Sequence, residues 1–106
     1  MSKVTMVRIY LREGDHDGHK PLVSEIMTLL HGELKVRGTT VYRAVASFGS
    51  RGEVHADDML RLAVHLPLVV EFFDDPEVVH QALQRLAPLI PSGHIVCWDA
   101  QCPDAS

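Results

Sequence analysis

The segment from Phe48 to His55, with the sequence FGSRGEVH, combines groups that could bind a small anion. Backbone N–H groups of a glycine-rich turn and the guanidinium of Arg51 can both donate hydrogen bonds to a carboxylate or a phosphate. A plain connection between two strands would need the same glycines, because they adopt positive φ angles at little cost. Two interpretations stay open: an ordinary loop, or a site for a ligand or partner made by Arg43, Phe48, Gly49, Arg51, Gly52 and His55.

Arg43 joins this candidate site if the end of its strand lies at a cleft between subunits. An ion pair, buried or at an interface, would explain the residue equally well. Catalysis would also need a nucleophile activated by a neighbouring base. Ser50 is the only hydroxyl beside these groups, and nothing in the sequence would activate it. We therefore predict a binding protein and not an enzyme.

A second group of chemically active side chains lies in the segment DHDGH, residues 15–19. Its two imidazoles and two carboxylates would suit a divalent transition metal, with His16 and His19 as ligands and His55 as a third candidate. Loops of Asp, Gly and His are also ordinary solvated turns. The remaining histidines fall on helix flanks or strand entrances, where we expect surface or capping roles: His31, His65, His80 and His94.

The composition limits which elements can position these groups. The chain has 106 residues, 46% of them hydrophobic, and a net charge of −4. We expect one domain over residues 1–100, a flexible tail over 101–106, and a reduced, cytoplasmic protein with free Cys97 and Cys102. Mild acidity argues against nucleic acid as a partner. No apolar run approaches the roughly 20 residues that cross a bilayer, and the N-terminus lacks the apolar stretch of a signal peptide.

Hydrophobic periodicity predicts six main elements. Alternation with period two indicates a strand over residues 4–12, and β-branched and aromatic residues indicate another over 39–48. Apolar residues spaced by three and four predict a helix of about four turns from Pro21 to about Leu34, weakened at Gly32. Strands over 68–73 and 94–98 flank a second helix, for which Asp75 is the expected N-cap and Pro76 the first residue. We also expect a short helix between 57 and 66.

The order strand, helix, strand, strand, helix, strand predicts an α+β ferredoxin-like sandwich (βαββαβ), a four-stranded antiparallel sheet with two helices on one face. The other face stays uncovered. Glu71 belongs on this open face, because burying an unpaired carboxylate is costly, and Arg8 can pair with it there. The face is otherwise largely apolar, so we predict that other subunits cover it, although an exposed face with scattered apolar residues remains the alternative. The predicted interface residues are Met6, Arg8, Tyr10, Glu71 and Phe73.

An ordered set of residues resembles one known family. It consists of VRIY (7–10), Glu13, KPL (20–22), TVYR (40–43), FGxxGxxH (48–55) and LxLxxxLPLVVE (60–71). This pattern looks like the PII-like bacterial family catalogued as domain of unknown function 190. The resemblance implies the ferredoxin-like fold and a relation to PII signal-transduction proteins and CutA proteins, which are trimers packed through their open sheet faces.

The resemblance also implies a function. Residues 49–66 occupy the position of the regulatory loop of PII proteins, so we expect a trimer that binds a small anionic ligand at subunit clefts and signals through this loop to a partner protein. The PII nucleotide site is not carried over, because residues 89–94 contain one glycine and no Lys or Arg. The alternative is a divalent-metal-binding protein of the CutA type.

Overall fold

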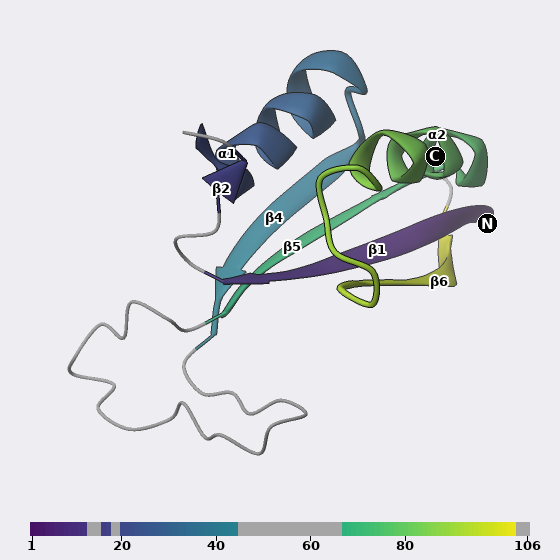
Figure 1. Ribbon diagram of the computed structural model, residues 1–106. Coiled ribbons are helices and arrows are strands. Elements are labelled where there is room, and N and C mark those ends of the chain that lie inside the picture. The colour runs from purple at the N-terminus through teal and green to yellow at the C-terminus, as the bar shows by residue number, and fades with distance from the viewer. Residues whose placement is uncertain (13–15, 18–19, 45–66, 104–106) are drawn as a thin grey trace.

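Four strands form one antiparallel sheet in the order β4-β5-β1-β6 (Figure 1). The computed structural model describes residues 1–12, 16–17, 20–44 and 67–103. Two very short strands pair separately as a hairpin ahead of the first helix. The elements are β1 (Ser2–Arg12), β2 (His16–Asp17), β3 (Lys20–Pro21), α1 (Leu22–Met27), the π-helix η1 (Thr28–Glu33), β4 (Gly38–Arg43), β5 (Pro67–Asp74), α2 (Pro76–Leu86) and β6 (Ile95–Cys102).

The predicted ferredoxin-like α+β fold is confirmed. Both helical segments lie on one side of the four-stranded sheet in Figure 1. Strand β1 lies in the interior of the sheet and pairs with β5 on one side and β6 on the other. This order follows from two crossover connections that each carry a helix across the same face. No helix within the described part of the chain is long and apolar enough to cross a membrane.

The core lies between the sheet and the helices. Alternate residues of β1, such as Val7 and Ile9, are fully buried, as is Phe72 of β5. They meet apolar residues that recur at helical spacing on the helices, including Ile26 and Leu86. Strand period and helical period thus bring one apolar face of each element into a single core.

The first helical segment differs from the predicted regular helix. The α-helix ends at Met27, and the chain continues as a π-helix from Thr28 to Glu33. In this segment the backbone N–H of Leu34 donates to the carbonyl of Leu29 at 2.9 Å. Gly32 lies in this π-helical turn, and glycine holds α-helical geometry weakly. Lys35 then adopts a left-handed φ of 52° and ends the segment.

The last strand is longer than predicted. The prediction ended it at Trp98, but β6 continues through Asp99 and Gln101 to Cys102. Gln101 and Cys102, which we assigned to the tail, pair with Lys3 and Ser2 of β1. A strand at the edge of a sheet tolerates polar side chains because most of them face solvent. The predicted helix between 57 and 66, strand residues 45–48 and residues 104–106 lie outside the described residues.

Candidate functional site

The face of the sheet opposite the helices carries the candidate site. The register places Arg8 opposite Glu71 on one side and Val96 on the other, so these residues share a face. The same alternation assigns to this open face Met6, Arg8 and Tyr10 of β1, Val69, Glu71 and Phe73 of β5, Thr40 and Tyr42 of β4, and Val96 and Trp98 of β6. All five predicted interface residues therefore lie together on one surface.

An ion pair occupies the middle of the open face, as predicted. Arg8 donates to Oε2 of Glu71 from Nε at 2.9 Å and from Nη2 at 2.6 Å. The pKa of Arg8 is raised by its hydrogen bond to Glu71 and, to a smaller extent, by one to Tyr10. The guanidinium also lies over the ring of Trp98, 5.2 Å from its centroid. One cation thus links three neighbouring strands, β5, β1 and β6.

A hollow lies beside this ion pair on the β4 side. Its volume is about 300 Å³, and its lining is Arg8, Tyr10, Tyr42, Val69 and Glu71. Both tyrosines are exposed in the single chain. Tyr10 and Tyr42 lie on either side of Val69 in the sheet. Two exposed phenol rings flanking a valine, with a compensated ion pair nearby, form a surface suited to an aromatic or aliphatic group.

The far end of the open face is partly covered. Val4 has the same strand parity as Met6, yet only 2% of it is exposed. It lines a second hollow of about 280 Å³ together with Phe73, Cys102 and Pro103, among other residues. The end of β6 and the residue after it therefore shelter this part of the face, and the exposed apolar surface is concentrated around Tyr10, Tyr42, Val96 and Trp98.

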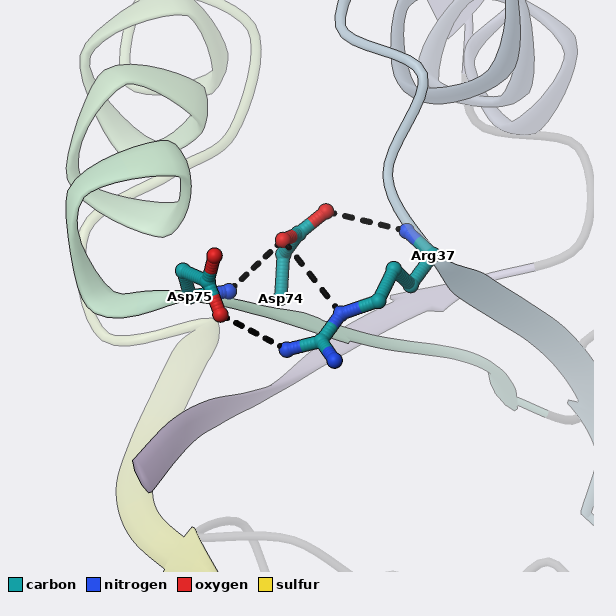
Figure 2. A network of polar contacts seen from close by, with 3 residues as sticks. All are labelled: Arg37, Asp74 and Asp75. Atoms are coloured by element: carbon teal, nitrogen blue, oxygen red, sulfur yellow. Dashed lines mark hydrogen bonds and ion pairs between the residues drawn. The ribbon is translucent and has the colours of Figure 1, made fainter. Parts of the chain in front are cut away.

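A polar network at one end of the sheet joins two loops (Figure 2). Asp74 is the one buried polar or charged side chain within the described residues. Its Oδ2 accepts from the backbone N–H of Arg37 at 3.0 Å, and its Oδ1 accepts from that of Asp75 at 2.7 Å. Nη2 of Arg37 donates to Asp75 at 2.8 Å, and its Nε lies 3.5 Å from Asp74. The chain entering β4 is thereby fixed to the chain entering α2.

The expected cap of α2 is only partly confirmed. Asp75 occupies the N-cap position and Pro76 is the first helical residue, as predicted. The Asp75 side chain makes no capping hydrogen bond and binds Arg37 instead. Sequence reasoning missed Arg37 and Asp74, because no local pattern marks a contact between residues so far apart in sequence.

The other predicted site residues are only partly described. Arg43 is exposed at the end of β4. His16 lies in β2. Across residues 1–12, 16–17, 20–44 and 67–103, no three His, Cys, Asp or Glu side chains are grouped to hold a metal. The predicted residues Phe48, Gly49, Arg51, Gly52, His55 and His19 lie outside the described residues.

Comparison with known sequences decides the family. The family model of DUF190, described as "Uncharacterized ACR", matches residues 4–102. The chain belongs to the DUF190 family. One relative, the UPF0166 protein MJ1524 of Methanocaldococcus jannaschii, is 34% identical over 96 residues, which cover 91% of this chain and 87% of the relative. A UPF0166 protein of Aquifex aeolicus is 29% identical over 84 residues, 79% of either chain.

Solved structures share the fold of this DUF190 chain at low sequence identity. CPII from Thiomonas intermedia K12, bound to ADP and bicarbonate, has a TM-score of 0.63 at 18% identity, covering 95% of this chain and 89% of CPII. The divalent ion tolerance protein CutA1 from Ehrlichia chaffeensis has a TM-score of 0.60 at 8% identity, covering 97% and 84%. The GlnK–ATP complex of B. subtilis has a TM-score of 0.52 at 14% identity, covering 92% and 82%. The PII-like fold is thus confirmed.

Proposed function

We propose that this DUF190 protein is a PII-like regulatory protein that works as an oligomer, most simply a trimer. It binds a small anionic ligand at clefts between subunits and signals through residues 49–66 to a partner protein. The observation that carries the proposal is the open sheet face, where a compensated ion pair, Arg8 with Glu71, lies among exposed apolar side chains.

The open face supports assembly on physical grounds. Tyr10, Tyr42, Val96 and Trp98 are all large, apolar and exposed on one side of the sheet. Contiguous patches of this kind on a single chain usually mark a surface that another protein covers. The charges at its centre are already paired with each other, so a second copy can cover them without leaving an isolated charge.

The fold likeness to CPII supports an anionic ligand. CPII was solved with ADP and bicarbonate, and a second structure adds AMP. All three ligands are anions that an arginine can bind by hydrogen bonds and charge. Arg43 is exposed at the end of β4, next to the segment for which we predict ligand contact, and we propose it as the cation of the site.

We further propose that the role is binding without bond chemistry and that the protein is cytoplasmic. The sequence offers no activated nucleophile beside the ligand loop. Cys97 and Cys102 are both free, which suits a reducing compartment. The net charge of −4 disfavours nucleic acid as the partner.

Two measurements test the proposal. Light scattering after size-exclusion chromatography gives the mass in solution, and a monomer at micromolar concentration would remove the clefts. Thermal melting with ADP, AMP, ATP and bicarbonate then tests the ligand. A native-state ligand at 100 times its Kd adds about 2.7 kcal/mol of stability, so binding should raise the Tm of a domain of this size by about 10 °C.

Arg43→Ala should lower the ligand-induced rise in Tm. The matched control is Arg85→Ala, because Arg85 is also exposed but lies on α2, paired with Glu33 on the helix side. Equal responses of both variants and of the wild-type protein would exclude Arg43 from the site. If none of the four anions raises Tm at millimolar concentration, the proposed ligand class is wrong.

A further inference from the structure

We propose that Trp98 of one copy inserts into the hollow formed by Arg8, Tyr10, Tyr42, Val69 and Glu71 on a second copy. The inference rests on the proposed oligomer and adds the contact that holds it together. Trp98 was not among the predicted interface residues. It lies on the open face because β6 pairs with β1 in a register that sets Trp98 opposite Met6.

Trp98 is a large apolar side chain that remains partly exposed to solvent in a single copy. The residue, which carries the only indole in the chain, is 39% exposed. Its ring contacts the Arg8 guanidinium in its own chain, which fixes the ring over the sheet without hiding it from water. An indole held in this way needs little additional ordering on binding, and tryptophan is among the residues that most often dominate an interface.

The hollow has a size and a lining suited to an indole ring. Its volume of about 300 Å³ exceeds the roughly 150 Å³ of a cavity that holds benzene. Tyr10, Tyr42 and Val69 provide aromatic and aliphatic walls, and Tyr42 is 50% exposed when no partner covers it. Two tyrosines can pack against an incoming ring edge-to-face or offset.

Glu71 adds a polar match. Both hydrogen bonds from Arg8 end on Oε2 of Glu71. Among the described residues no donor is assigned to the other oxygen, Oε1, and Glu71 is one of the residues that line the hollow. A buried indole N–H needs an acceptor, and a carboxylate oxygen supplies one.

The arrangement of the sheet explains why the occupant is a second copy. Trp98 lies on β6, at one edge, and the hollow lies over β4, β5 and β1, at the other side of the same face. Each copy therefore offers one ring and one hollow that its own ring does not fill. Contacts of this type can pass from copy to copy around a closed ring.

The single tryptophan makes the proposal measurable by its own fluorescence. On dilution of the full chain, emission from Trp98 should shift to longer wavelength in parallel with the loss of oligomer mass. Tyr42→Arg places a cation in the hollow beside Arg8, and we expect association roughly 30-fold weaker, the scale of losing an interface hot spot. The matched control is Val41→Arg, the neighbouring β4 residue, which is 40% exposed on the opposite face.

Each outcome decides the inference. Red-shifted emission and weaker association for Tyr42→Arg, with Val41→Arg unchanged, support it. An intact oligomer whose Trp98 emission does not respond to dilution or to Tyr42→Arg overturns it and leaves the proposed oligomer standing. A monomeric wild-type protein overturns both. If Tyr42→Arg fails to fold by circular dichroism, Trp98→Ala against Cys97→Ala tests the same contact by oligomer mass, because Cys97 is exposed on the other face of β6.

Discussion

Arg8 and Glu71 face each other across β1 and β5, and both hydrogen bonds of the guanidinium end on a single carboxylate oxygen. In the isolated chain their side chains are 40% and 18% exposed. Solvent therefore screens the pair, and we expect it to contribute little to the stability of one copy. Its effect on assembly should be larger.

Glu71→Gln should weaken assembly far more than it destabilises the folded monomer. The change leaves the Arg8 charge uncompensated on a surface that the second copy would cover, and breaking a buried pair costs about 3–5 kcal/mol. Unfolding in urea measures the first effect, and the concentration dependence of oligomer mass measures the second. The control is Asp99→Asn, which breaks an exposed pair with Lys3 on the other face. Equal association of both variants would contradict the prediction.

Gly38→Ala should destabilise the fold by about 1–3 kcal/mol. A Cβ at Gly38 would lie 2.7 Å from Cε1 of Phe73, so the ring has to move. That ring is also held by Arg37, whose guanidinium lies 5.5 Å from the ring centroid. Gly32→Ala is the matched control, because nothing lies within 4 Å of the added methyl group. We expect urea midpoints to separate the two variants, and equal midpoints would mean that Phe73 moves aside freely.

Asp74→Ala should destabilise the fold by about 1–3 kcal/mol. The carboxylate, only 9% exposed, accepts hydrogen bonds from the backbone N–H groups of Arg37 and Asp75, and both donors lose this acceptor in the variant. Asp75→Ala removes the neighbouring carboxylate, which is 64% exposed and binds only the Arg37 side chain in Figure 2. It should cost less than about 1 kcal/mol. Denaturant unfolding of both variants provides the comparison, and a larger loss for Asp75→Ala would reverse our ranking of the two.

The predicted metal site at His16 and His19 can be tested separately. If His16 and His19 bind a divalent transition metal, replacing both with Ala should lower zinc or copper affinity roughly tenfold or more. Losing even a residue that only hydrogen-bonds to a metal ligand lowers metal affinity by about this factor. Isothermal titration of the purified chain measures this. His80→Ala is the control, because His80 is exposed on α2 and contacts Gln84. Unchanged affinity in the double variant would exclude these ligands.

The sequence predicted the layers of the fold because each layer rests on local patterns. Alternation along β1 separated Val7 and Ile9 from Met6 and Arg8, and the structure has the same division. The position of Arg8 beside Glu71 was also predictable. A carboxylate within an apolar strand avoids the cost of burial only when it lies on the open face, where Arg8 can pair with it. The π-helix around Gly32 was not predicted, because helical spacing of apolar residues does not distinguish an α turn from a π turn.

The rest of the site depends on the register between strands distant in sequence. Trp98 and Tyr42 reach the open face only through the pairing of β6 with β1 and of β4 with β5. No pattern within either strand fixes that register. Alternating polar residues after Trp98 were the one signal that β6 continues, and we interpreted them as a tail. The contact of Arg37 with Asp74 has no sequence signal, because it joins the segment before β4 to the end of β5, which meet only in the folded chain.

The position of β1 inside the sheet also governs how the chain can fold. Its Arg12 pairs with Pro67 of β5, and its Ser2 pairs with Cys102 of β6. Both partners of β1 are therefore distant from it in sequence, one in β5 and the other in β6. Contacts so distant in sequence form slowly, because the chain loses the conformational entropy of the intervening loop before the paired strands stabilise it. We therefore expect the pairing of β1 with β5 and β6 to form late in folding, so that the sheet assembles slowly and as one cooperative unit.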